Sequence, residues 1–255
     1  MLLASFNFVL GAIFGSFINV CIYRIPKRLD ISFERSKCPH CKKQIPWHLN
    51  IPILSYLFLG GTSKCCKKKI SFQYLFIEFI SGIFFLTNFL YLNLNQVALW
   101  DVVFLILLII IAIDYKTYLI FDIFPYSLII IGLLTMVSYP HLNIFKVSLN
   151  EALITCAISI FTFWLIRFLF LYFKKVEALG LGDIKLIGGL TIFTGFVFYI
   201  YLLLLSSALG ILFYLLFKPK KQKAFRIPFG SCLGVAFILL ACYKIFSFNF
   251  LNFIY

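Results

Sequence analysis

Two aspartates stand where long apolar runs meet polar segments, and their placement suits acid–base chemistry. Asp183 follows two glycines in Gly180-Leu181-Gly182-Asp183 and opens an apolar run that extends to Phe217. Asp114 closes another run, Val102 to Ile113, which contains no polar side chain. An ionisable group at such a position is costly unless it serves a purpose. Both aspartates are therefore candidate site residues.

Carboxylates from two helices that meet at one membrane depth would form an aspartyl dyad. Two close carboxylates cannot both ionise easily, so they share a proton and titrate as a unit. One can act as general base on water while the other protonates or stabilises the scissile carbonyl oxygen. Gly180 and Gly182 would let the backbone approach another segment closely. The pattern thus suggests peptide hydrolysis by Asp114 and Asp183.

Each acid also has a structural interpretation. Asp122 and Asp183 precede apolar helices, where an aspartate accepts hydrogen bonds from free amide groups and complements the helix dipole. For Asp122 we favour this capping role, because Pro125 lies just inside the expected helix. Asp114 ends its helix, where the dipole disfavours a negative charge, and Lys116 could neutralise it as an ion pair. Spacing alone leaves both interpretations of the pair open.

The composition predicts that membrane-spanning helices position these residues. The chain is 63% hydrophobic and 13% charged, with a mean hydropathy of +1.03, whereas soluble domains are roughly 45–50% apolar and 25% charged. The first apolar stretch lacks the basic start and small-residue cleavage site of a removed signal. Residues 1–25 are therefore expected to be a retained first helix. The predicted class is an all-α polytopic membrane protein.

Crossings of about 20 apolar residues account for most of the chain. The block 184–217 is too long for one ordinary crossing, and both of its flanks are basic. The positive-inside rule then requires an even number of crossings. We predict a hairpin of one short and one full helix that turns near Thr194-Gly195, giving about eight transmembrane helices in total. The other crossings are expected at 2–25, 72–92, 97–113, 123–139, 148–173 and 228–246.

Basic residues set the predicted orientation. Lysines and arginines gather in the segments Lys27 to Lys69, Lys174 to Asp183 and Lys218 to Arg226, which we therefore place in the cytoplasm together with Asp114 to Asp122. The net charge of +14 could suggest nucleic acid, but charge in short loops more often fixes topology or meets anionic lipid. We expect contact with membrane lipid and no nucleic-acid partner.

A small cytoplasmic insert, residues 26–71, holds four of the eight cysteines, Cys38, Cys41, Cys65 and Cys66. A rough repeat relates the stretch from Lys37 to Ile45 to the stretch up to Ile70. Each stretch would form a tight turn of the zinc-knuckle type, and the two turns together could bind one tetrahedral Zn²⁺ through thiolates. The second is irregular, because Ser63 takes the place that matches Cys38. Cys65, His40 or His48 could supply the fourth ligand; alternatively, the insert folds without metal.

These motifs together resemble the type IV prepilin leader peptidase/N-methyltransferase family, membrane aspartyl proteases with a G-x-G-D motif. Gly15 to Val20 with Tyr23 to Pro26 resemble the family's opening helix and its exit. The cysteine insert follows, with Asn50-Ile51-Pro52, Ser55-Tyr56-Leu57, Tyr74 and Glu78 in family order. Ile113-Asp114 with Asp122 resembles the first aspartate motif, Glu177 to Leu186 the second, and Ile227-Pro228-Phe229-Gly230 the C-terminal signature.

The resemblance implies a bifunctional enzyme of the bacterial cytoplasmic (inner) membrane with its active site on the cytoplasmic face. It would cut the basic leader from type IV prepilins or pseudopilins at a Gly–Phe-like junction and methylate the new amine with S-adenosylmethionine. By motif position Asp114 and Asp183 are catalytic, Gly180, Gly182 and Asp122 support them, residues 26–71 are associated with methyl transfer, and residues 72–255 form the peptidase domain. The methyl-donor site and the oligomeric state are not indicated.

Two departures from the family pattern keep alternatives open. The first aspartate motif of the family usually ends Ile-Pro-Asp, whereas this chain has Ile120-Phe121-Asp122. The irregular second cysteine pair puts methyl transfer in doubt more than cleavage. The alternatives are a leader peptidase without methyltransferase activity, and a non-enzymatic polytopic transporter or assembly scaffold.

Overall fold

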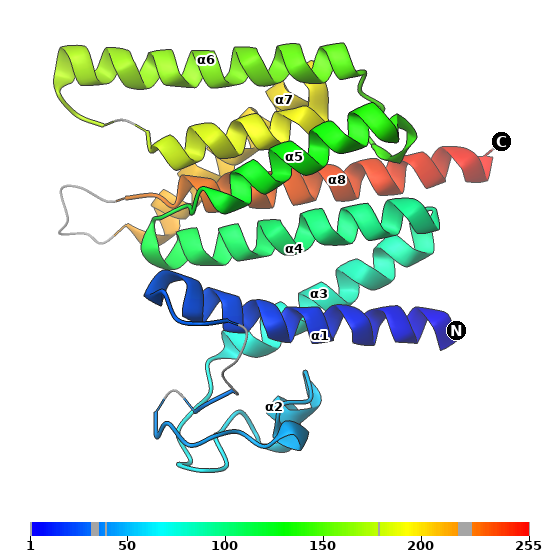
Figure 1. The fold of residues 1–255 in the computed structure, drawn as a ribbon, viewed down its shortest axis with the longest axis vertical. Coiled ribbons are helices and arrows are strands. Elements are labelled where there is room, and N and C mark those ends of the chain that lie inside the picture. Colours follow the sequence, from blue (N-terminus) through cyan, green and yellow to red (C-terminus); the bar gives the residue numbers. More distant parts are fainter. Residues whose placement is uncertain (1, 32–35, 39, 178, 219–225, 255) are drawn as a thin grey trace. The chain divides into compact units, whose positions relative to one another are not determined.

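The computed structural model of the chain describes residues 2–31, 36–38, 40–177, 179–218 and 226–254, and it is helical throughout its apolar segments (Figure 1). Over these residues it contains two isolated β-bridges and no extended strand. The predicted all-α class is confirmed. The α-helices are α1 Leu2–Arg24, α2 Leu54–Phe58, α3 Phe72–Tyr91, α4 Leu94–Thr117, α5 Ile123–Ser138, α6 Leu149–Lys174, α7 Leu181–Phe217 and α8 Phe229–Ile254.

The helices agree with the predicted crossings. Among the described residues, six are long and apolar enough to span a membrane, and α5 is a shorter apolar helix. The longest, α7, is broken at Gly195, so its two halves can cross separately. Counting α5 and the second half of α7 makes the observed helices consistent with about eight crossings. The basic residues Lys220, Lys221 and Lys223 of the predicted cytoplasmic flank lie outside the described residues.

The chain divides into two compact units, Met1–Ile109 and Ile110–Tyr255. In the first unit, small residues let α1 and α3 approach closely. A Cβ atom added at Gly15 would lie 2.8 Å from the Cα of Glu78, and one added at Gly82 would lie 2.7 Å from the Phe8 ring. Small residues at helix contacts are the usual means of close packing in membranes. The rings of Phe84 and Phe104 stack at 3.6 Å and join α3 to α4.

The insert of the first unit contains the predicted repeat as two similar turns. One is closed by the bridge Lys37–Gln44 and the other by the bridge Thr62–Lys69. The amide of Cys38 donates to the carbonyl of Lys43, and the amide of Ser63 donates to that of Lys68. Cys38 and Ser63 therefore occupy equivalent positions, as the sequence predicted.

The second unit is built around the first half of α7. Leu186, Ile187 and Leu190 are completely buried, and α5, α6 and α8 all pack against this helix. Glycines again allow the approach, since a Cβ at Gly188 would lie 2.7 Å from Ile160 of α6, and one at Gly189 would lie 3.1 Å from a backbone oxygen of α5. The helix that begins with the G-x-G-D motif is thus the core of this unit.

The break at Gly195 is the predicted hairpin turn. Gly195 has φ 64° and ψ −174°, a combination open essentially to glycine alone. Both freed helix ends have partners: the Asn143 side chain donates to the Phe193 carbonyl at 2.9 Å, and the Phe196 amide donates to Glu151 Oε1 at 3.1 Å. A broken helix is tolerated in an apolar medium when its free backbone groups are satisfied in this way.

Replacing Gly195 by alanine should destabilise the fold by about 1–3 kcal/mol, because the new side chain would force a glycine-only conformation. The site is also occupied, since the added Cβ would collide with Glu151 and Val147. The midpoint of thermal unfolding in detergent measures the effect. Gly210→Ala is the matched control, because it lies inside the helical second half of α7 and its Cβ would meet only Ile227, at 3.8 Å. Equal midpoints for the two variants would contradict the role given to the break.

Candidate active site

Asp114, near the end of α4, is 4% exposed and is held by the start of α8. Its Oδ2 accepts the backbone N–H of Ser231 at 2.6 Å and lies 2.9 Å from the Ser231 hydroxyl. That hydroxyl is also 2.9 Å from the Ile111 carbonyl, and its single proton serves one acceptor at a time. Asp114 ends its own helix unfavourably, but it meets the N-terminus of another helix, where a negative charge is stabilised. Its partner is therefore Ser231.

Asp183 lies in the first turn of α7. Its Oδ2 lies 3.1 Å from the point at which a Gly180 side chain would begin. The charge of Asp114 acts on Asp183, and both charges act on Cys232 in α8. The second unit thus brings the two predicted carboxylates together from separate helices, beside the start of a third.

Ile120, in the loop between α4 and α5, packs between the two glycine-containing segments. A Cβ at Gly182 would lie 2.9 Å from the Ile120 Cβ, and one at Gly230 would lie 2.5 Å from its Cδ1 and 3.2 Å from Asp114 Oδ2. Gly180, Gly182 and Gly230 all have ordinary backbone angles, because only Gly60, Gly61 and Gly195 have positive φ among the described glycines. Glycine is needed at these positions because a side chain would crowd or collide with neighbouring groups, and a positive φ angle is not the reason.

The capping role predicted for Asp122 is wrong. Asp122 stands at the N-cap position of α5, but its side chain makes no capping hydrogen bond there. Its Oδ1 instead pairs with Lys185 Nζ at 2.8 Å, and the Lys185 ammonium also lies over the Tyr126 ring. Asp122 has a helical conformation, φ −56° and ψ −29°, whereas a capping residue needs an extended one. The aspartate links the start of α5 to the first turn of α7.

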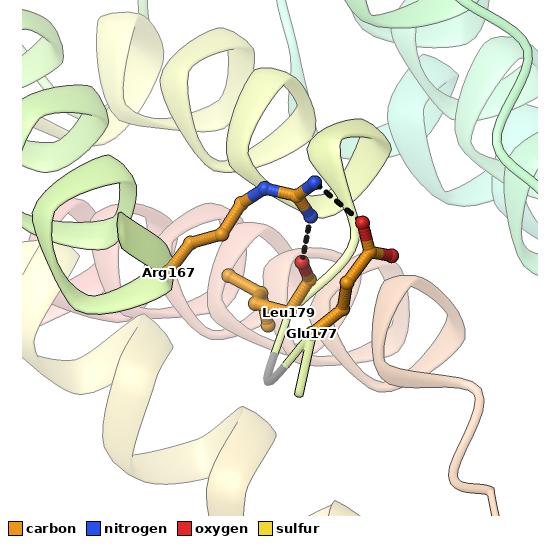
Figure 2. Close-up of polar contacts among 3 residues, drawn as sticks. All are labelled: Arg167, Glu177 and Leu179. Atoms are coloured by element: carbon orange, nitrogen blue, oxygen red, sulfur yellow. Dashed lines mark hydrogen bonds and ion pairs between the residues drawn. The ribbon is translucent and has the colours of Figure 1, made fainter. Parts of the chain in front are cut away.

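Arg167 of α6 fixes the segment that leads into α7 (Figure 2). Its guanidinium donates to the Leu179 carbonyl at 2.7 Å and to Glu177 Oε1 at 2.8 Å. The Arg167 side chain is 14% exposed, whereas that of Glu177 is 67% exposed. The bond to the backbone is therefore the better shielded of the two, and it sets the path of the chain just before Gly180.

The sequence analysis missed Ser231 and Arg167. Arg167 carried a usable signal, since it is a charge inside the apolar span 148–173, and such charges usually have a role. Ser231 follows the Ile227-Pro228-Phe229-Gly230 signature directly, but a serine near a helix start gives no indication of a distant carboxylate partner.

The insert brings together the four cysteines that the sequence singled out. The Sγ atoms of Cys38, Cys41, Cys65 and Cys66 lie within 4.8 Å of one another. Cys38 and Cys66 are 3.8 Å apart, and all four are free thiols. Tetrahedral zinc with Zn–S bonds of about 2.3 Å separates its sulfurs by about 3.8 Å. The group fits such an ion, with Cys65 supplying the sulfur that Ser63 lacks.

Hydrogen bonds tune two of these thiols in opposite directions. Burial raises the pKa of the Cys38 thiol, but hydrogen bonds from the Ser63 hydroxyl and from the backbone of Cys41 and His40 outweigh burial and lower the pKa to about 5. Contact with the Cys65 thiol raises the pKa of Cys41 to about 11. A thiolate is the form of cysteine that binds metal, and the hydrogen bonds to Cys38 favour its thiolate.

Two segments of the chain match models of known protein families. Residues 9–92 match the bacterial peptidase A24 N-terminal domain, and residues 102–215 match the type IV leader peptidase family. The first segment contains the four cysteines, and the second contains Asp114 and Asp183.

Curated relatives match along most of their length. A prepilin leader peptidase/N-methyltransferase of Pectobacterium carotovorum subsp. carotovorum is 35% identical over 89% of this chain and 88% of its own. Proteins with the same name from Vibrio cholerae and Klebsiella pneumoniae are 29% and 35% identical, over 91% and 75% of this chain and 93% and 85% of their own. No solved structure matches the chain.

Arg167→Gln should free the segment before Gly180, because it removes the charged donor that holds the Leu179 carbonyl. Loss of a charged hydrogen bond worth about 1.5–3 kcal/mol predicts at least tenfold faster hydrogen–deuterium exchange at the start of α7. Lys174→Gln, at the end of the same helix, is the control that also removes one positive charge. Unchanged exchange in Arg167→Gln would show that other contacts hold the segment.

Proposed function

Because the chain belongs to the type IV leader peptidase family, we propose that it removes the leader peptide of type IV prepilins or pseudopilins and then N-methylates the new N-terminal residue. One observation carries the first activity: Asp114 and Asp183, from two separate helices, lie close enough for their charges to interact. Family membership favours an enzyme over the transporter or scaffold alternative. The chain is a multi-pass membrane protein, and we place it in the bacterial inner membrane.

Asp114 and Asp183 have different contacts, and we use this difference to assign each a catalytic role. Asp114 accepts the Ser231 amide, lies beside the Ser231 hydroxyl and meets a helix N-terminus, contacts that offset part of the cost of burying its ionised form. We assign it as the general base that takes a proton from water. Asp183, repelled by that charge, is the acid that protonates the scissile carbonyl oxygen. Water adds to the carbonyl carbon. As the adduct collapses, Asp114 gives its proton to the leaving nitrogen, the proton on the adduct oxygen returns to Asp183, and the C–N bond breaks to release the new amine.

The surrounding residues hold this arrangement. Gly180 and Gly182 leave the space that the Asp183 carboxylate and Ile120 occupy. Asp122 supports the site indirectly through its ion pair with Lys185, two residues after Asp183. The Asp122 side chain is more than half exposed, so solvent screens the pair and its contribution to stability is small. Its role is to align α5 with α7.

The membrane supplies the setting for the substrate. The outer surface of α6 exposes large apolar side chains, among them Phe161, Trp164 and Phe173, which suit contact with lipid. We place the dyad on the cytoplasmic face, because the segments next to it carry the predicted cytoplasmic charges. The basic leader of a prepilin would be attracted to the acids and to anionic headgroups, and its apolar remainder would lie among the helices.

Methyl transfer needs S-adenosylmethionine as the methyl donor, and we associate it with the insert of residues 26–71. Zinc held by Cys38, Cys41, Cys65 and Cys66 would lock the two turns of the insert together, in the manner of a structural site with no open position. The alternative, a peptidase that lacks methylation, would process the same substrate and leave its new amine unmodified.

Asp114→Asn and Asp183→Asn should each lower leader cleavage by at least about 100-fold, the smaller end of the range for general acid–base groups. Mass spectrometry of a coexpressed prepilin measures this and reports methylation in the same run. Both variants should accumulate in the membrane at the wild-type level. Asp122→Asn is the control, with cleavage within a few-fold of wild type. Substantial cleavage by either dyad variant would refute the assignment.

The purified protein should contain about one zinc ion per chain, as single four-ligand sites do. Elemental analysis of Cys65→Ala should show most of the metal lost. Ser63→Cys combined with Cys65→Ala should recover it, because position 63 is the structural equivalent of Cys38. Absence of zinc from the wild-type protein would remove the ligand assignment, and no recovery in the double variant would show that position 63 cannot replace Cys65.

A further inference from the structure

A buried carboxylate of the first unit has no role in the chemistry assigned so far. Glu78 of α3 is 7% exposed. Its Oε2 accepts the backbone N–H of Ile53 at 2.7 Å, and the Ser16 hydroxyl lies beside it. Across the described residues, no lysine or arginine forms an ion pair with this carboxylate. A buried charge normally has a paired cation, so Glu78 is short of one.

A second acceptor lies on the facing surface of α1. Asn19 is 3% exposed, and its Nδ2 donates to the Tyr74 carbonyl at 3.2 Å. Its Oδ1 is buried with no hydrogen-bond partner. Asn19 is one helical turn from Ser16, so both project from one face of α1. Tyr74 is likewise one turn from Glu78 in α3. A buried amide oxygen without a hydrogen-bond donor and a buried carboxylate with no cation paired to it among the described residues therefore occur together in this region.

The backbone beside this pair is strained. Ile53 has φ 63° and ψ −55°, which is an outlier for a β-branched residue. Its amide, held in this conformation, is the one that Glu78 accepts. The Tyr74 hydroxyl is within electrostatic range of both Glu78 and Cys38. The acceptors thus lie where α1, α3 and the cysteine insert meet.

We propose that Glu78 and Asn19 bind the primary amine that accepts the methyl group. The inference rests on the proposed methyltransferase function. An amine offers the N–H donor that the Asn19 Oδ1 lacks, and its ammonium form offers a positive charge to Glu78, which has no ion pair among the described residues. A free α-amine has a pKa of about 7.7–8.0, so much of it must lose a proton before its lone pair can attack.

In the proposed transfer step a sulfonium compound donates the methyl group, and Glu78 and Asn19 bind the amine that accepts it. The amine nitrogen forms a bond to the methyl carbon as the bond from carbon to the donor sulfur breaks. The sulfonium becomes a neutral thioether and leaves. The proton that the nitrogen loses passes to the Glu78 carboxylate and then to water, while the Asn19 oxygen holds a remaining N–H and directs the lone pair. Glu78 is the catalytic residue, and Asn19 orients the amine.

The decisive variant is Glu78→Gln, which keeps the shape and removes the charge. With a prepilin substrate, cleavage should stay within about twofold of wild type, and methylation should fall by at least about 100-fold, the range for a lost proton acceptor. Methylation at the wild-type rate would overturn the proposal. Wild-type protein that cleaves without methylating would instead contradict the proposed function, so the two failures are distinguishable.

Asp101→Asn is the matched control. Asp101 is also a buried carboxylate of the first unit; its 2.6 Å hydrogen bond from Asn88 joins α3 to α4, whereas Glu78 binds the backbone of the insert at Ile53. Its replacement should leave methylation within a few-fold of wild type. Zinc content separates chemistry from folding: Glu78→Gln should keep the metal content of the wild-type protein. Loss of zinc together with methylation would assign Glu78 to anchoring the insert and would overturn the catalytic role.

Binding measurements identify the source of the amine. A short peptide with a free N-terminal phenylalanine should bind at least tenfold more weakly to Glu78→Gln than to wild type, whereas the same peptide with an acetylated N-terminus should bind both proteins equally. The affinity for S-adenosylmethionine alone should not change. If that affinity falls and peptide binding is unaltered, the oxygens hold the ammonium of the methyl donor, and the acceptor-site proposal is wrong.

Discussion

A polar group inside an apolar span must find a partner within the protein, and this requirement organises the second unit. The break at Gly195 leaves a free carbonyl and a free amide, and these groups are bound by Asn143 and Glu151, residues that lie 50 and 45 positions away in the chain. Asp114 is bound by Ser231, 117 positions away. Each bond therefore closes a long loop and fixes the two segments that it joins at one depth. The dyad is positioned by the same rule that keeps the helices intact.

The need for a partner also distinguishes acids that stabilise the fold from acids that are candidates for catalysis. Asp101 is bonded directly to Asn88, and Glu151 is bonded to the Phe196 amide at the break. Their carboxylates accept hydrogen bonds that hold separate segments of the fold together. Asp183 differs, because it faces a like charge. Glu78 also accepts a backbone amide, that of Ile53, but it lies one helical turn from Tyr74, the partner of Asn19, whose buried Oδ1 has no hydrogen-bond partner. An acid kept in such an environment is a candidate for proton transfer.

Local patterns predicted the elements well but failed where partners are distant. The apolar runs predicted most helices within a few residues, although α8 continues to Ile254, eight residues beyond the predicted end, and the basic flanks with Gly195 predicted the hairpin in α7. The cysteine repeat gave the two turns of the insert. The cap assigned to Asp122 was wrong because Lys185, far along the chain, competes for its carboxylate. Ser231 and Arg167 were missed for the same reason: their bonds form only when separate helices pack.

The two proposed reactions depend on each other in one direction only. Methyl transfer consumes an amine that does not exist until the peptide bond is broken, so the dyad controls both products. Cleavage needs nothing from Glu78 or the cysteines. If the cysteines bind zinc as proposed, the use of Cys65 in place of a cysteine at position 63 therefore bears on the second reaction alone. The four sulfurs still gather within 4.8 Å, so a metal ion bound there would hold the two turns of the insert together, and with them the strained Ile53 segment that meets Glu78.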